Sequence, residues 1–205
     1  MKKIMFDDKY GLTDAVLQGR KTMTRRFIKQ LLNVENPDIS DWGLKDGGKA
    51  MITLYEGGRP MTDIFPMYQP GEVVAVAQSY NDAGMEAEFE THDEALAIIL
   101  LGKQREKGWS NKMFVRADLM PHQIRITDIK AERLQDITEE DCLREGLVKR
   151  TDGFIPEEYF YTYCGADVDF AYVKTAFADL IDKVSGKGTW DRNPWVFAYS
   201  FELVK

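Results

Sequence analysis

The chain has 205 residues, of which 44% are hydrophobic and 30% charged, and its formal net charge at pH 7 is −7. This composition excludes a disordered chain, because it holds enough apolar side chains to bury a core. The negative net charge excludes a protein that coats nucleic acid non-specifically, because that behaviour needs a broad basic surface.

No segment of the sequence resembles a membrane span or an export signal. The longest apolar stretch, Ala95 to Leu101, is far shorter than the roughly 20 residues that a spanning helix needs. The N-terminal residues Met1-Lys2-Lys3 lead into Asp7-Asp8 rather than into an apolar signal core. We therefore expect a cytoplasmic protein without a membrane partner.

The cysteines and histidines do not predict a metal site. Cys142 and Cys164 are the only cysteines, which is too few for a disulfide framework or a four-thiolate zinc site within one chain. His92 and His122 lack a Cys, Asp or Glu partner at metal-ligand spacing. We expect free thiols in a reducing cytosol, locally satisfied histidines, and neither a metal nor a cofactor.

In the first half of the chain, the sequence predicts one short helix followed by several short strands. The helix spans Thr13 to Gly19, with Thr13 as its N-cap and Gly19 as its C-terminal stop. Glycine pairs and a Pro-Gly pair supply the tight turns, at Gly57-Gly58 and Pro70-Gly71. Predicted extended segments are Lys21 to Phe27, Met51 to Tyr55, Val73 to Ala77, Lys112 to Arg116 and Gln123 to Lys130.

In the second half, two helices and one long strand are predicted. A capping-box pattern at Thr138 begins a helix that closes at Gly146. A longer helix over roughly Asp169 to Val184 carries one apolar stripe, and Trp195 to Val204 alternates as a strand with at least one buried face.

The chain as a whole reads as one α+β domain over residues 1–205. Short mixed strands with few helices fit this class better than alternating βαβ units. No repeat, proline-rich linker or low-complexity tract divides the sequence. The acidic and then helical composition of about 81–110 is interpreted as an insertion.

A basic run stands out near the N-terminus, because five basic residues occur there without an acidic one. The charge pattern alone leaves two interpretations open: a focused anion site, or a solvated face that offsets nearby acids. The run consists of Arg20, Lys21, Arg25, Arg26 and Lys29.

Four stretches resemble the ASCH domains of the PUA-like superfamily, and in particular their longer phage-associated branch. Together they span nearly the whole chain in the order found in that family. They are Gly19 to Arg26 (GRKTMTRR), Pro70 to Val74 (PGEVV), Arg125 to Gly146 (RITDIKAERLQDITEEDCLREG) and Trp190 to Phe201 (WDRNPWVFAYSF).

The resemblance implies a small PUA-like β-barrel with flanking helices and a cleft that binds RNA or a modified nucleoside. One family member is an amidohydrolase that removes the acetyl group from N4-acetylcytidine. Its catalytic Lys and Thr have the spacing of Lys21 and Thr24, and its catalytic Glu corresponds to Glu145, seven residues beyond Thr138. The resemblance therefore implies Lys21, Thr24 and Glu145 as catalytic residues.

The sequence also departs from the family pattern. Relatives of the phage-associated branch continue the central strand with an aromatic residue and an Arg-Glu pair, whereas Val74 to Ser79 reads VAVAQS here. The chain is also about twice as long as the small amidohydrolases. The ligand of those relatives need not be shared.

Amide hydrolysis needs a nucleophile and a proton acceptor, and the candidate residues can supply both. A neutral Lys21 would take the proton of Thr24, and Glu145 would relay a proton to the leaving amine. On an ideal strand, however, positions 21 and 24 face opposite sides, so their cooperation requires a turn or a bulge. Each residue also has a non-catalytic interpretation: Lys21 as a surface lysine, Thr24 as an ordinary strand threonine, and Glu145 as a glutamate that pairs with a surface cation.

Two rival functions remain open. In a non-catalytic RNA-binding module, Arg20, Arg25 and Arg26 would grip phosphates, and the mouth of the cleft would be basic. The second rival function is that of an accessory protein of a phage or mobile element that binds another protein. Trp190 and Trp195 either stack bases or pack against the barrel, and packing is the more usual role of such residues.

Overall fold

The computed structural model describes residues 1–32, 34, 37–45, 49–84, 107–151 and 159–204. The chain divides into two compact units, each built from segments that are far apart in the sequence. Unit 1 comprises Met1–Phe6, Val73–Ile124 and Val204–Lys205, and unit 2 comprises Asp7–Glu72 and Arg125–Leu203.

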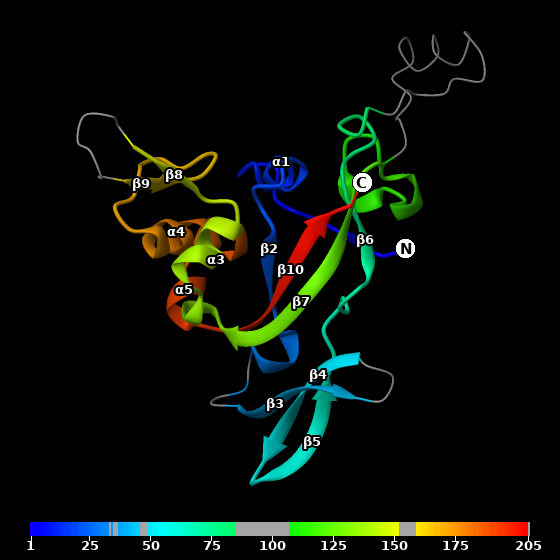
Figure 1. Ribbon diagram of the computed structural model, residues 1–205, viewed down its shortest axis with the longest axis vertical. Coiled ribbons are helices and arrows are strands. Elements are labelled where there is room, and N and C mark those ends of the chain that lie inside the picture. The colour runs from blue at the N-terminus through cyan, green and yellow to red at the C-terminus, as the bar shows by residue number, and fades with distance from the viewer. Residues whose placement is uncertain (33, 35–36, 46–48, 85–106, 152–158, 205) are drawn as a thin grey trace. The chain divides into compact units, whose positions relative to one another are not determined.

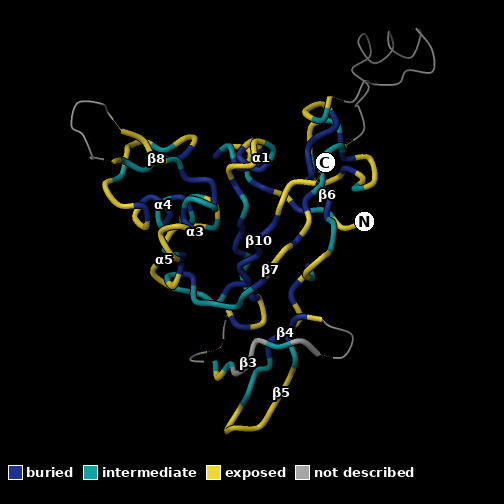
Figure 2. The backbone as a smooth tube through the Cα atoms, in the orientation of Figure 1, coloured by how far each residue is buried: buried dark blue, intermediate teal, exposed yellow. Residues whose placement is uncertain are grey.

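The centre of unit 2 is a group of long strands (Figure 1). Strand β10 (Trp195–Leu203) lies between β2 (Met23–Phe27) and β7 (Gln123–Arg133) in the hydrogen-bonded order. β2 and β10 are antiparallel, with Met23 opposite Ser200. Residues 196–201 of β10 are all buried (Figure 2), as expected for a strand with neighbours on both edges and side chains packed on both faces.

A second sheet of unit 2 consists of three antiparallel strands in the order β3 (Asp38–Lys45), β4 (Lys49–Glu56) and β5 (Arg59–Ile64). The predicted turn at Gly57-Gly58 is confirmed, because both glycines have positive φ, at 58° and 76°. Only glycine adopts this conformation at little cost. Much of β5 is exposed, as its yellow tube in Figure 2 shows.

The helices of unit 2 include α1 (Leu12–Leu17), α3 (Glu139–Arg144), α4 (Val173–Ser185) and α5 (Thr189–Arg192). Helix α4 buries Val173, Phe177 and Leu180 of the predicted apolar stripe, whereas Val184 at its end is exposed. The remaining elements are the β8 (Val148–Arg150) and β9 (Phe160–Thr162) pair and the 3₁₀ helices η1 (Lys29–Leu31) and η4 (Leu134–Asp136).

Unit 1 has a smaller core. Its strands β1 (Lys3–Ile4) and β6 (Val73–Val76) pair in parallel, and two 3₁₀ helices follow, η2 (Lys112–Phe114) and η3 (Ala117–Leu119). The core residues are Ala75, Ala77, Tyr80, Val115 and Met120.

The prediction of an α+β fold is confirmed, since strands predominate and the helices are few. The described strands form open sheets, and no closed barrel is found among them. The single domain stays a prediction, and residues 85–106 of the predicted insertion lie outside the described residues. Of the helices that the structure describes, none has the length and apolar character needed to cross a membrane.

Two local predictions were wrong. The segment Lys112 to Arg116 was expected as a strand, but it begins with η2, where the side chain of Asn111 accepts a hydrogen bond from the backbone N–H of Met113. Such a local side-chain cap offers the backbone an alternative to strand pairing. Helix α1 begins at Leu12 after Gly11 rather than at a Thr13 cap, and Thr13 instead donates its hydroxyl proton to Asp8.

Candidate functional site: a buried charge network

The short helix α3 positions the acidic part of the network. Its predicted cap is confirmed: the hydroxyl of Thr138 accepts a hydrogen bond of 3.1 Å from the backbone N–H of Asp141. Glu145 follows the helix as its C-cap, and Gly146 then turns the chain with a φ of 105°. A Cβ at Gly146 would meet Cβ of Lys21 at 3.5 Å, an ordinary contact distance, so the positive φ rather than lack of space favours glycine at this position.

Lys21 and Glu145 form a buried ion pair. Nζ of Lys21 lies 2.5 Å from Oε2 of Glu145 and donates a second hydrogen bond of 2.7 Å to its backbone carbonyl oxygen. The two residues are 2% and 5% exposed. Burial lowers the pKa of Lys21 below its ordinary value of 10.5, because a buried amine is harder to charge; Glu145 opposes this effect, and Arg26 and Arg25 add to it.

Arg25 joins Glu145 to two further carboxylates. Its Nη1 donates to Oε1 of Glu145 at 2.9 Å, its Nε donates to Oε1 of Glu132 at 2.9 Å, and its Nη2 lies 3.2 Å from Oδ2 of Asp141. The side chain is only 1% exposed, and its guanidinium lies 5.9 Å from the ring centre of Phe177. Burial alone would lower the pKa of Arg25, but Glu145 and Glu132 outweigh it and raise this pKa.

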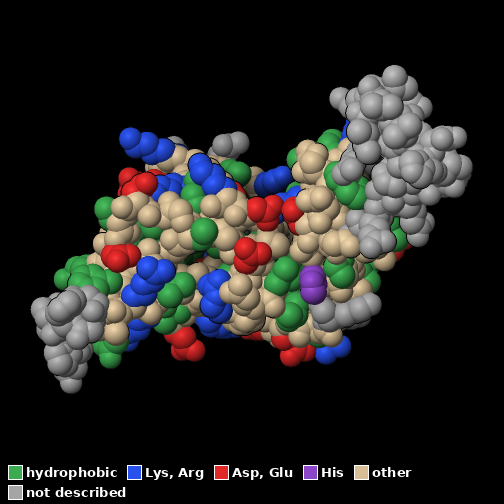
Figure 3. All heavy atoms as spheres, turned by 90° about the horizontal axis from the view of Figure 1, so that it is seen from above, with side chains coloured by type: hydrophobic (Ala, Val, Ile, Leu, Met, Phe, Trp, Pro, Cys, Tyr) green, Lys and Arg blue, Asp and Glu red, His purple; other side chains and the backbone are tan. Residues whose placement is uncertain are grey.

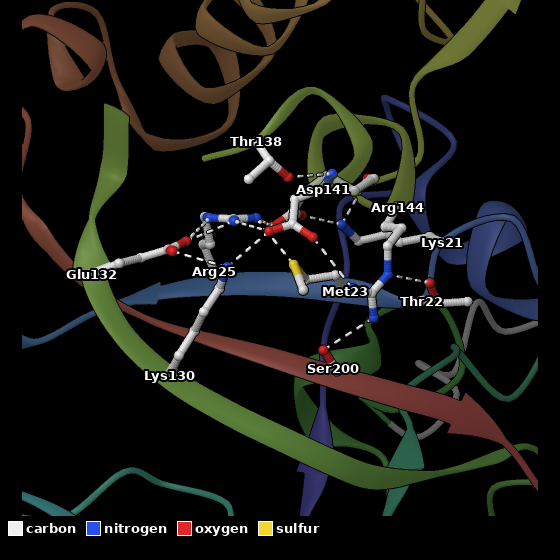
Figure 4. Close-up of polar contacts among 11 residues, drawn as sticks. Lys21, Thr22, Met23, Arg25, Lys130, Glu132, Thr138, Asp141, Arg144 and Ser200 are labelled. Carbon is white, nitrogen blue, oxygen red and sulfur yellow. Dashed lines mark hydrogen bonds and ion pairs between the residues drawn. The ribbon is translucent and has the colours of Figure 1, made fainter. Parts of the chain in front are cut away.

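Asp141 links the buried pairs to two partly exposed bases, Lys130 and Arg144 (Figure 4). Lys130 contacts Oδ2 of Asp141 at 2.9 Å, and Arg144 contacts Oδ1 at 3.2 Å. Burial alone would raise the pKa of Asp141, but the hydrogen bond from Lys130 and the nearby positive charges lower it below 3.8. Arg144 also donates to the hydroxyls of Thr22 and Ser200, at 3.3 and 3.0 Å.

The charges of this network are almost balanced. Its members carry one positive charge more than negative charges when all are ionised, and equal numbers when Lys21 is neutral. The side chains of Lys130 and Arg144 are 40% and 35% exposed, so solvent screens their charges, and among the buried members the three carboxylates outnumber the two bases. The members are the bases Lys21, Arg25, Lys130 and Arg144 and the acids Glu132, Asp141 and Glu145.

Of the residues predicted to be catalytic, the structure brings two into contact. Lys21 and Glu145 are 124 residues apart in the sequence and share a buried ion pair. Thr24 is opposite Tyr199 in the register of β2 and β10, and strand alternation places it on the other face of β2 from Met23 and Arg25. The described contacts therefore unite Lys21 with Glu145, and the nucleophilic role of Thr24 stays a prediction.

The three arginines predicted to bind phosphate lie in different settings. Arg25 is buried among carboxylates, whereas Arg20 is exposed and donates from Nε to Oε1 of Gln18 at 2.9 Å. Arg26 is half-buried, and its charge acts on Tyr68 and Tyr199. On the face drawn in Figure 3, the basic and acidic side chains of the described residues are interspersed. The basic cleft mouth stays a prediction.

Sequence reasoning missed four members of the network, although their spacing contains a signal. Asp141 precedes Glu145 by one helical turn, so both side chains point to the same side of α3. Lys130 and Glu132 are two residues apart on β7 and therefore share a face of the strand. Such spacing is common on solvated surfaces, so only the structure distinguishes this buried cluster. The missed members are Lys130, Glu132, Asp141 and Arg144.

The remaining candidates make local contacts. Trp190 packs edge-on against Phe177 with ring centres 6.0 Å apart, and the guanidinium of Arg133 lies 4.9 Å from the ring centre of Trp195. Cys142 is buried, and burial raises the pKa of its thiol to about 12. Within the part of the chain that the structure describes, no group of three His, Cys, Asp or Glu side chains is arranged to hold a metal ion.

Comparison of the chain with protein-family models, with curated proteins and with solved structures found no match.

Proposed function

We propose that this chain is a hydrolase that removes an acyl group from the base amine of a modified nucleoside, with N4-acetylcytidine as the type of substrate. We also propose that it has the PUA-like barrel of the family that its sequence resembles. The observation that carries the activity is the buried contact between Lys21 and Glu145. The resemblance implies both residues as catalytic, and residues that lie 124 positions apart in the sequence have no local reason to be in contact.

The proposed reaction uses Lys21 as the base. A neutral Lys21 takes the hydroxyl proton of Thr24, and the resulting oxygen attacks the carbonyl carbon of the acyl group. When the C–N bond breaks, the proton that Lys21 took from Thr24 passes through Glu145 to the leaving base amine, which leaves Lys21 neutral again, and the acyl group remains as an ester on Thr24. Attack by water then cleaves that ester and releases a carboxylic acid. Burial favours this use of Lys21, because it favours the uncharged amine.

The same geometry argues against phosphate binding as the main role of the buried charge network. Arg25, one of the arginines predicted to bind phosphate, has a side chain that is 1% exposed and already contacts three carboxylates. Displacing those carboxylates would leave buried charges unpaired, which is costly. Arg20, which is exposed, is the predicted phosphate ligand that solvent reaches most easily.

The test is incubation of the chain with N4-acetylcytidine and a panel of other acylated nucleosides, followed by mass spectrometry of the products. Lys21→Met should abolish product formation. Arg125→Met is the matched control, because Arg125 forms an exposed ion pair with Glu202 at 3.1 Å. If no acylated nucleoside is turned over while single-stranded RNA binds with strong salt dependence, the RNA-binding module replaces the hydrolase.

A further inference from the structure

Glu145 contacts Arg25 as well as Lys21. The two oxygens of the Glu145 carboxylate are divided between the two bases: Oε1 accepts from Arg25 at 2.9 Å, and Oε2 lies 2.5 Å from Lys21. A guanidinium stays protonated in proteins, whereas a buried amine readily loses its proton. Arg25 therefore keeps Glu145 paired even when Lys21 is neutral.

We propose that Arg25 is a positioning residue, which holds the Glu145 carboxylate and thereby allows Lys21 to act in its neutral form. This inference rests on the proposed function for its catalytic meaning, but the arrangement itself is independent of any substrate.

The geometry around Arg25 fits this role better than a role in binding an outside ligand. Its planar fork is fixed from the far side by Glu132, at 2.9 Å from Nε, and by Asp141, at 3.2 Å from Nη2. Nη1 also contacts Sδ of Met23 at 3.3 Å. A guanidinium held at several points is pre-organised, so Glu145 is held in one orientation.

The charges that act on the amine of Lys21 come from two neighbouring elements. Glu145, at the end of α3, favours the protonated amine, whereas Arg25 and Arg26, on β2, favour the neutral one. Removing the charge of Arg25 removes its repulsion of the Lys21 ammonium. It also leaves Lys21 as the base that pairs with the Glu145 carboxylate. Both changes act in the same direction and favour the protonated amine.

The decisive experiment measures the titration of Lys21 directly. The full chain is labelled with ¹³C at the lysine ε carbons, and the Lys21 signal is assigned by its loss in Lys21→Met. In Arg25→Gln the titration midpoint should rise by about 1 to 3 pH units, the usual effect of one nearby charge on a buried group. A midpoint that does not move would overturn the inference. Arg125→Gln, which removes an exposed arginine, should leave the midpoint unchanged.

A second variant covers the case in which Arg25→Gln does not fold. Arg25→Lys keeps the charge but lacks the fork that spans Glu145 and Glu132, so the Lys21 midpoint should rise above that of the unaltered chain. A midpoint equal to that of the unaltered chain in Arg25→Lys would overturn the positioning role.

Activity provides the second readout. With N4-acetylcytidine as substrate, Arg25→Gln should move the acid limb of the kcat profile to higher pH by the same amount and change KM little. Absence of turnover in the unaltered chain would refute the proposed function, while the titration would still decide the role of Arg25. Turnover combined with an unmoved Lys21 midpoint would refute the role of Arg25 alone.

Discussion

At the scale of single residues, the main finding is that a lysine and an arginine from a basic run are not surface charges. Lys21 and Arg25 are buried, and each contacts at least one carboxylate from a segment more than a hundred residues away. A buried charge is tolerated only when it is paired or when it is neutralised. The structure shows pairing with carboxylates for both residues, and burial in addition lowers the pKa of Lys21 below its ordinary value.

Lys21→Arg should reduce turnover of N4-acetylcytidine by about 10² to 10⁴, the usual worth of general acid–base catalysis. The substitution keeps a positive charge but supplies a group that stays protonated. Steady-state kinetics measures the loss, and circular dichroism checks that the fold persists. Turnover near the unaltered rate would show that Lys21 is an electrostatic contact and not a base.

Thr24 provides a separate test of the nucleophile. Thr24→Ser keeps a hydroxyl and should retain part of the turnover, whereas Thr24→Ala should lose it and should form no ester intermediate. Rapid acid quench and mass spectrometry of the intact protein detect that ester. If Thr24→Ala retains full activity, the nucleophile is not Thr24, in keeping with its place on the other face of β2 from Arg25.

The sequence predicted part of this site and had no means to predict the rest. The resemblance led to Lys21 and Glu145, whose contact the structure shows. It gave no sign that Arg25 faces inward, because a basic run has the same composition on a solvated face and in a buried network. The pairing of Arg25 with Glu132 and Asp141 depends on how β2, β7 and α3 meet, which local spacing does not specify.

At the scale of elements, helix α3 is only six residues long, yet it and its C-cap carry three charged members of the network. Short helices are marginal on their own, so the cap and the tertiary contacts must hold it. Capping was predictable, because the pattern from Thr138 to Asp141 is local. The strand predicted at Lys112 to Arg116 failed because the cap by Asn111 competes locally with strand pairing.

Thr138→Ala should destabilise the fold by about 1 kcal/mol, because it removes the hydroxyl that caps Asp141. Urea unfolding measures the loss, and Thr138→Ser, which retains the hydroxyl, is the control. Because α3 positions both Asp141 and Glu145, turnover should fall in Thr138→Ala more than in Thr138→Ser. Equal stability of the two variants would show that the cap contributes nothing.

At the scale of the whole molecule, the charge network links stability to pH. The folded pKa of Asp141 lies below 3.8, its ordinary value. A depressed carboxylate pKa contributes stability that is fully present above the unfolded value and is lost as pH falls through the folded value. The contribution of Asp141 is therefore fully present at neutral pH, begins to fall near the ordinary pKa of 3.8, and is lost as pH falls through the lower folded pKa.

Asp141→Asn should accordingly be less stable than the unaltered chain at neutral pH, and this difference should shrink as the pH falls from about 5 to 2. Denaturant unfolding at a series of pH values measures it. Asp118→Asn is the control, because Asp118 pairs with Arg116 at the surface and its exposed pair is worth little. A difference that is independent of pH would contradict the linkage.

Neither compact unit is a continuous piece of chain, and this has a consequence for the order of events during synthesis. Unit 2 needs residues on both sides of the segment Val73–Ile124, and Lys21 meets its partner only after another 124 residues have been added. A ribosome releases the chain from its N-terminus at a pace of about 5 to 20 residues per second, so the first 72 residues wait several seconds for their partners. During that interval the basic side chains that later lie buried are exposed. Closing such long loops is also slow, so we expect unit 2 to form late, after most of the chain has been synthesised.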